Sequence, residues 1–222
     1  MQRTIRHTRG GATLGVFFVL SLAALLSACA TRPVVSPALS PQQRAAAWQA
    51  HQQALAGLER WAFEGRVAVK DTQQESWSAS LRWRQRGDGF DIRLAGPFGQ
   101  GAAQLSGKPG YAVIETSEHA ALSASSAEAL MQEQLGWAVP VQGFRHWLIG
   151  LPAPGVVGRH ALDGAGRLSE LEQDGWQIHY DRYQEVDGLV LPRKMTLENA
   201  RLRVRLVIDD WAVSAAEADD VV

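Results

Sequence analysis

The 222-residue chain has a single cysteine, Cys29, so no internal disulfide can stabilise it. It also lacks HExxH and GxSxG motifs, a phosphate-binding glycine loop and a second cysteine that could act as a nucleophile. The histidines show no metal-ligand spacing, and adjacent carboxylates such as Asp209 and Asp210 point to opposite faces of a strand. We therefore expect no enzyme, no metal and no dissociable cofactor. Sequence order alone leaves one enzymatic alternative, a lipid hydrolase whose serine, histidine and acidic residue converge in the fold.

Clustered positive charge is absent as well. The chain carries 22 Lys and Arg against 23 Asp and Glu, and the basic residues are scattered. The exception is Arg201, Arg203 and Arg205, whose spacing of two places them on one face of a strand. We interpret that face as solvated rather than as a binding patch, and we expect no nucleic-acid partner.

The N-terminal segment is typical of an export signal. Basic residues precede the apolar run Leu14–Leu26, and the small residues Ser27 and Ala28 stand directly before Cys29. The run is shorter than the ~20 residues that span a bilayer. We predict that residues 1–28 are a lipoprotein signal peptide and that Cys29 carries diacylglycerol and an N-acyl chain. An ordinary signal peptide is the alternative, but it leaves an unpaired thiol in an oxidising compartment.

The mature part is expected to contain one domain. Residues 29–40 include Pro33 and Pro37 among small residues and predict a flexible tether, with multiple acyl chains as the membrane anchor. Residues 41–213 form the predicted domain, and residues 214–222 an acidic, disordered tail.

Most of the domain shows the period-two alternation of half-buried β-strands. Trp61, Phe63, Val67 and Val69 alternate with polar residues, and the pattern returns in further short segments. Those segments are 77–84, 90–94, 102–106, 111–116, 119–123, 160–162, 168–172, 176–181, 194–198 and 201–211. They predict a curved antiparallel sheet with one apolar face.

Three segments have helical spacing instead: 41–58, 125–135 and 144–149. These helices are a small cover for so large a sheet. We expect a partly filled apolar interior, and a fully packed sandwich remains an equal alternative.

Four short motifs make the chain resemble the LolB family of outer-membrane lipoprotein receptors, over residues 48–213. They are Trp48 with His51-Gln52-Gln53, the loop Gly96-Pro97-Phe98-Gly99, Phe144-Arg145-His146-Trp147-Leu148-Ile149-Gly150-Leu151-Pro152, and the closing Asp209-Asp210-Trp211. The resemblance implies a half-barrel sheet with a helical lid, whose cavity takes the acyl chains of other lipoproteins. The implied partners are a LolA-like periplasmic carrier, lipoprotein cargo and the outer membrane; a monomer is expected. Ala30, rather than aspartate, after the lipidated cysteine agrees with an outer-membrane location.

The resemblance also implies site residues. The family has a protruding loop for membrane insertion, and the matching residues here are Pro97, Phe98 and Gly99, with Phe98 in place of the leucine of the best-known member. An exposed Phe98 would contact a membrane or partner, while folding back onto the sheet is the alternative.

For the acyl-chain cavity we expect Trp61, Trp83 and Trp147, because indole rings are large and apolar with one polar atom. The rival hypothesis is a scaffold lipoprotein whose solidly packed sheet docks envelope proteins. It predicts no lipid uptake.

Overall fold

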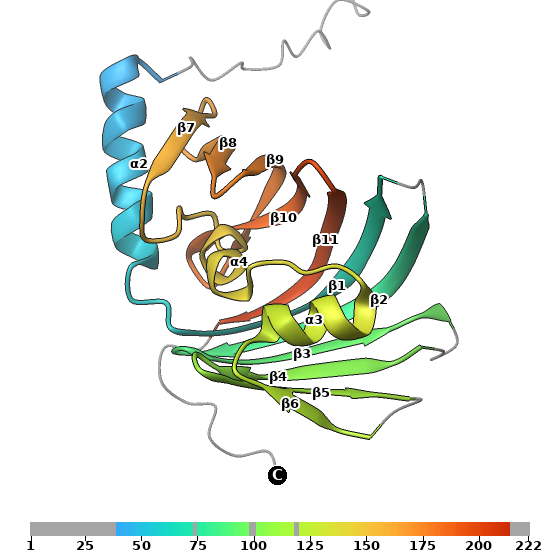
Figure 1. Cartoon of the computed structure of the whole chain (residues 1–222). Coiled ribbons are helices and arrows are strands. Elements are labelled where there is room, and N and C mark those ends of the chain that lie inside the picture. Colours follow the sequence, from blue (N-terminus) through green and yellow to red (C-terminus); the bar gives the residue numbers. More distant parts are fainter. Residues whose placement is uncertain (1–38, 73–74, 98–100, 118–119, 214–222) are drawn as a thin grey trace, which may run out of the picture. The chain divides into compact units, whose positions relative to one another are not determined.

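The computed structural model describes residues 39–72, 75–97, 101–117 and 120–213, which form a curved antiparallel sheet with three helices on it (Figure 1). The spatial order of the strands is β6-β5-β4-β3-β2-β1-β11-β10-β9-β8-β7. Their bounds are β1 Arg60–Asp71, β2 Ser76–Arg86, β3 Gly89–Ala95, β4 Ala103–Lys108, β5 Tyr111–Thr116, β6 Leu122–Ala124, β7 Val157–Leu162, β8 Leu168–Gln173, β9 Trp176–Val186, β10 Leu189–Glu198 and β11 Leu202–Val213. Within the described residues β6 and β7 do not pair with each other, so the sheet is open, as predicted.

The alternation in the sequence becomes a buried face and a solvated face. In β1, Trp61, Phe63, Val67 and Val69 are all buried, while most of the residues between them are exposed. The same pattern in β2 and β11 places a continuous apolar surface across the centre of the sheet.

A bulge between Glu64 and Gly65 bends β1 against β11. At Gly65 the two backbones approach so closely that a Cβ would lie 2.3 Å from the carbonyl oxygen of Val207. Only glycine fits at this point, which lies in the middle of the longest strand pair.

The helices are α2 Pro41–Leu55, α3 Ala127–Leu135 and α4 Val141–Trp147. A capping box of Ser40 and Gln43 begins α2, and Ser126 caps α3 through the backbone N–H of Ala129. Helix α3 ends at Gly136, whose φ of 76° is the left-handed conformation that glycine tolerates. Helix α2 contacts β10, and α3 packs over β4, β5 and β6. None of the helices in the described part of the chain is long and apolar enough to cross a membrane.

The structure confirms the predicted fold class and adjusts several boundaries. Helix α2 ends at Leu55 rather than at residue 58, and α4 begins at Val141 rather than at residue 144. Strands β9 and β10 extend farther than the pattern indicates, because two register shifts and Pro192 interrupt their alternation. The predicted signal peptide, Cys29 and the acidic tail lie outside the described residues, as does nearly all of the predicted tether.

Candidate functional site

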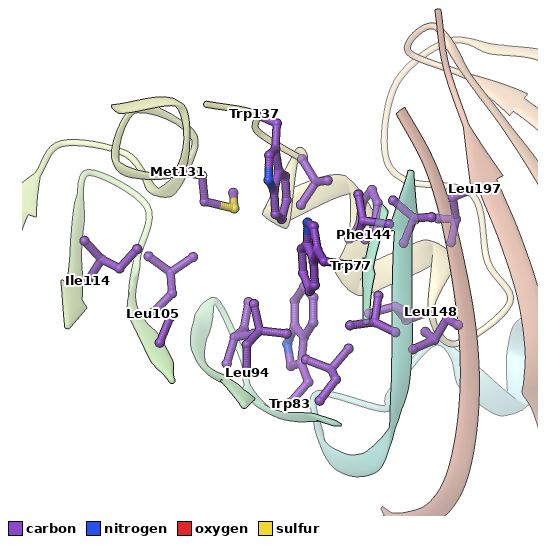
Figure 2. Close-up of a pocket in the computed structure, with 18 residues that line it drawn as sticks. Trp77, Trp83, Leu94, Leu105, Ile114, Met131, Trp137, Phe144, Leu148 and Leu197 are labelled. Carbon is purple, nitrogen blue, oxygen red and sulfur yellow. The ribbon is translucent and has the colours of Figure 1, made fainter. Parts of the chain in front are cut away.

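An apolar cavity of about 80 Å³ lies between the sheet and its helical cover (Figure 2). All 18 residues that line it are hydrophobic. A buried water typically makes about three hydrogen bonds, and the polar side-chain atoms among these lining residues are limited to indole N–H groups. The cavity therefore suits an apolar ligand, and neither a charged substrate nor a hydrated ion would be stable in it.

The sheet supplies most of the wall from the inner positions of seven strands. These residues are Val67, Val69, Trp77, Leu81, Trp83, Ile92, Leu94, Ala103, Leu105, Ile114, Leu197, Val204 and Leu206. The cover supplies the rest: Met131 of α3, Trp137 and Val139 of the α3–α4 connection, Phe144 of α4 and Leu148 just after it. The cavity thus depends on residues that are up to 139 positions apart in the chain.

Trp83 lies on the cavity wall, and its polar atom has a partner in the core. Its Nε1–H donates to Oε1 of Gln85 at 2.9 Å, and Nε2 of Gln85 donates to the carbonyl of Gly87 at 2.8 Å. Gln85 is itself 3% exposed and does not line the cavity. The indole can therefore present hydrocarbon to the cavity without leaving a buried donor unpaired.

Trp61 does not line this cavity. Its ring lies 6.0 Å from Phe63 and 6.1 Å from Trp83, and it is 4% exposed. Trp211 completes the cluster, with its ring centre 5.2 Å from that of Phe63. Trp61 thus supports the cavity wall from behind Trp83 as part of the aromatic core.

Trp147 is also placed outside the cavity lining, because it is the buried anchor of α4. Its Nε1–H donates to Oε1 of Gln173 at 2.8 Å, and its carbonyl accepts from the hydroxyl of Tyr180 at 3.0 Å. The ring contacts Phe144 and Trp176. Of the three tryptophans expected at the cavity, only Trp83 lines it in this structure.

Arg145 attaches the other face of α4 to the β2–β3 turn. Its guanidinium donates to the carbonyl of Gly87 at 3.1 Å and forms an ion pair with Asp88. By contrast, α3 is joined to α4 through one polar contact, from the backbone N–H of Val141 to Oε1 of Glu128 at 2.9 Å. Among the described residues, α4 therefore has more polar attachments than α3.

Two histidines beside the helices have lowered pKa values. Burial lowers the pKa of His51 on α2, the charge of Arg167 lowers it further, and Asp163 opposes the shift. Burial and the adjacent Arg145 lower the pKa of His146, with Asp88 in opposition. Both side chains are accordingly neutral at pH 7.

Ionisable groups in this region have structural partners. Burial alone would raise the pKa of Asp163, but hydrogen bonds from Arg167 and from two backbone N–H groups keep it below its usual value. Burial raises the pKa of Tyr180 and Tyr183, whose hydroxyls both donate to carbonyls. No three His, Cys, Asp or Glu residues of the described ranges are grouped to hold a metal.

The predicted insertion loop is only partly described. Pro97 is exposed after the end of β3, and Phe98 and Gly99 lie outside the described residues. The β3–β4 connection lies at the same end of the sheet as the β1–β2 and β10–β11 connections. At that end β3 finishes with Ala95, β1 finishes with Asp71, and β11 begins with Leu202.

Two important lining residues, Trp77 and Trp137, were not among the three tryptophans expected at the cavity. Trp77 lies near the start of β2 and belongs to the inward aromatics from which those three were chosen, since the pattern does not distinguish among them. Trp137 directly follows the helix-ending Gly136 and precedes Pro140, in a short connection that has no period of its own. The feature of the sequence that could have indicated Trp137 as a lining residue is a large aromatic side chain in so short a connection.

Comparison with known proteins agrees with these observations. The family model described as "Outer membrane lipoprotein LolB" matches residues 59–211. The outer-membrane lipoprotein LolB of Pseudomonas aeruginosa is 44% identical over 198 residues, covering 89% of this chain and 96% of the relative. That of Nitrosococcus oceani is 44% identical over 188 residues (84% and 92%), and that of Pseudomonas putida 43% over 194 residues (86% and 92%).

The solved structures that match the chain are much more distant in sequence. A LolA superfamily protein from Nitrosomonas europaea has a TM-score of 0.48 at 9% identity, covering 81% of this chain and 96% of its own. A DUF1329 family protein from Desulfovibrio piger has a TM-score of 0.46 at 7% identity, with coverage of 80% and 95%.

Proposed function

The chain belongs to the LolB family of outer-membrane lipoproteins, and on this basis we propose that it receives lipoproteins by taking their acyl chains into the cavity of Figure 2. The donor is a LolA-like periplasmic carrier, and the acceptor is the outer membrane that anchors the receptor through acylated Cys29. The observation that carries the proposal is the uniformly hydrophobic wall. Each methylene transferred from water into such a site contributes ~0.8 kcal/mol.

The cavity has to widen before it can hold an acyl chain. An apolar cavity of about 150 Å³ accommodates a single benzene molecule, and the present volume is about 80 Å³. Of the two covering helices, α3 has the weaker polar attachment, so we propose that α3 and Trp137 move while Arg145, Trp147 and Gln173 hold α4 in place.

Transfer in this scheme requires no covalent chemistry. Carrier, receptor and membrane each offer the acyl chains an apolar environment. The free-energy differences between successive steps are therefore small compared with the free-energy cost of exposing the chains to water. We propose that Phe98 assists the last step as an apolar contact with the membrane. Its loop joins β3 to β4 at one end of the sheet, and Pro97 beside it is exposed.

The test uses a Cys29→Ala protein without the signal segment, mixed with a carrier loaded with a labelled lipoprotein. Each protein is then isolated through its own tag, and the label is counted. Transfer to the Cys29→Ala protein supports the receptor role. Absence of transfer, with the protein folded and the carrier active, overturns it and favours the scaffold hypothesis.

A matched pair of variants connects transfer to the cavity. Leu94→Glu places a carboxylate in the wall, whereas Ser78→Glu adds the same charge at an exposed position of the neighbouring strand. A carboxylate without a partner in an apolar wall disfavours an apolar ligand, so we expect transfer to be lost in the first variant and kept in the second. Equal transfer by both would contradict uptake into this cavity.

A further inference from the structure

The apolar cavity meets a second, polar pocket at one end of the sheet. Val69, Trp77 and Trp137 belong to the walls of both. We call this second pocket the vestibule. Beyond the shared residues, polar side chains line it: Asp71, Glu75, Gln132, Asn199 and Arg201. The vestibule collects residues from the β1–β2 and β10–β11 connections, so it lies at the end of the sheet from which the β3–β4 connection also leaves.

Two indole rings separate the cavity from the vestibule. The rings of Trp77 and Trp137 lie 5.6 Å apart and are inclined by 31° (Figure 2). Both side chains are partly buried, unlike Trp83 deeper on the same strand, which is 3% exposed. An indole has an apolar face and one polar atom, which suits a boundary between a dry and a wet compartment.

The opposite end of the cavity is closed by packing. Trp83 lies against Phe63 and Trp61, and Gln85 is buried behind it with its own partners. A polar pocket does exist beyond this end, around Glu59, Arg145 and His146, but it has no lining residue in common with the cavity. Among the described residues, the cavity shares lining residues with the vestibule, at Val69, Trp77 and Trp137, and none with this other polar pocket.

We propose that acyl chains enter and leave the cavity between Trp77 and Trp137, and that the vestibule holds the glycerol ester and cysteinyl backbone of the cargo. This inference rests on the proposed function and adds the path and the orientation of the lipid. The methyl end of the chain points toward Trp83, and the polar end stays among Asp71, Glu75 and Arg201.

The two tryptophans differ in how they are attached, which identifies the moving part. Trp77 lies in strand β2, where it pairs with Val69 of β1, whereas Trp137 lies in the connection between Gly136 and Pro140. Gly136 has a φ of 76°, a conformation from which the chain can depart at low cost when α3 shifts. Trp137 and α3 therefore form the movable side of the passage, and Trp77 the fixed side.

Reversible closure of the passage tests the proposal directly. The Cys29→Ala background has no other cysteine, so Trp77→Cys and Trp137→Cys create a unique pair that a bis-maleimide with a disulfide in its spacer can join and a reductant can release again. The probe is palmitic acid carrying an environment-sensitive fluorophore at its carboxyl end. We expect cross-linking to slow association by more than about tenfold and cleavage of the spacer to restore it, and we expect the same treatment to leave the association rate of each single-cysteine variant unchanged. Equal association before and after cleavage of the spacer, once the cross-link has been verified by mass, overturns the passage while leaving uptake itself intact.

A second measurement does not depend on cross-linking. Trp77→Ala removes one side of the barrier, so association and dissociation of the probe should both accelerate severalfold; Trp48→Ala changes a partly buried tryptophan on α2 and serves as control. Unchanged rates in Trp77→Ala overturn the proposal. If the parent protein binds no probe at all, both the passage and the proposed function fail.

The orientation is tested with palmitic acid brominated near either end. Bromine near the methyl end should quench the fluorescence of Trp83, so this quenching should be absent in Trp83→Phe. Bromine near the carboxyl end should quench the fluorescence of Trp77, so that quenching should be absent in Trp77→Phe. The reverse assignment would contradict the vestibule as the site of the polar group.

Discussion

The indole Nε1–H of Trp147 donates to Oε1 of Gln173 at 2.8 Å, in a part of the core where Trp147 is 0% and Gln173 2% exposed. The same oxygen accepts from the backbone N–H of Ala153 at 2.9 Å, and Nε2 of Gln173 donates to the carbonyl of Ala153 at 2.8 Å. One buried glutamine thus satisfies three polar groups and holds α4 and the chain after it to the sheet. It also explains why Trp147 is an anchor rather than a cavity residue.

Replacing Gln173 with leucine should strongly destabilise the domain. The change leaves the indole N–H and both backbone groups of Ala153 unpaired, and each unsatisfied buried group costs ~1–3 kcal/mol. We expect a loss of at least ~2 kcal/mol in urea unfolding. Gln184→Leu is the control, because Nε2 of Gln184 is buried without a partner and its removal should be neutral or stabilising. Similar losses in both variants would contradict the role given to the Gln173 network.

The Gly65→Ala variant should fold poorly because its Cβ would lie 2.3 Å from a backbone oxygen and 3.0 Å from the Cα of Ile208. Relief requires β1 to move away from β11, at a cost of ~1–3 kcal/mol or more. Gly57→Ala provides a comparison, since no atom lies within 4 Å of the added carbon. Thermal unfolding should show a large loss for the first variant and little change or a small gain for the second. An unchanged Tm in Gly65→Ala would disprove the close approach.

Stability should decrease as pH falls below about 6.5, the ordinary pKa of histidine. Burial and nearby arginines lower the pKa of His51 and His146 in the folded state, so the unfolded chain takes up protons first. Their contribution is fully present above pH 6.5 and declines as pH falls toward the folded pKa values. The pKa of Asp163 is lowered too, but its effect appears only in more acidic solution, below its ordinary pKa of 3.8.

Urea unfolding between pH 5 and 8 checks this prediction. We expect a shallower pH dependence in a variant with His51→Gln and His146→Gln than in the parent protein. His160→Gln, at an exposed position of β7, is the control substitution. A double variant with the parent's slope would show that other groups cause the acid sensitivity.

Substitution of Phe98 should separate cargo binding from membrane insertion. Because the expected role of Phe98 is apolar contact with the membrane, Phe98→Glu should receive cargo from the carrier normally but release little of it to liposomes. Tyr111→Glu is a suitable control, since Tyr111 is 53% exposed at the opposite end of the sheet. Normal release by Phe98→Glu would contradict a membrane role for this residue.

The alternation of apolar and polar residues was sufficient to predict the strands at the centre of the sheet. Alternation from Trp61 to Val69 and from Leu202 to Ile208 is a property of neighbouring residues, and it directly records which side of a strand is buried. The pattern failed where the backbone departs from regular pairing, at the Pro192 and Lys194 register shifts between β9 and β10. A bulge changes which face a residue occupies, and its position depends on the partner strand.

The sequence by itself determined the antiparallel sheet, its short helical cover and the resemblance to the LolB family, because hydrophobic period, turn residues and short motifs are all local features. Only the tertiary structure decided which aromatics face the cavity. Trp61, Trp83 and Trp147 are equally apolar and inward, but Trp61 and Trp147 pack into the core while Trp83 reaches the wall. That outcome depends on hydrogen-bond partners and on elements distant in the chain, such as Gln173 for Trp147 and the connection that brings Trp137 to Trp77.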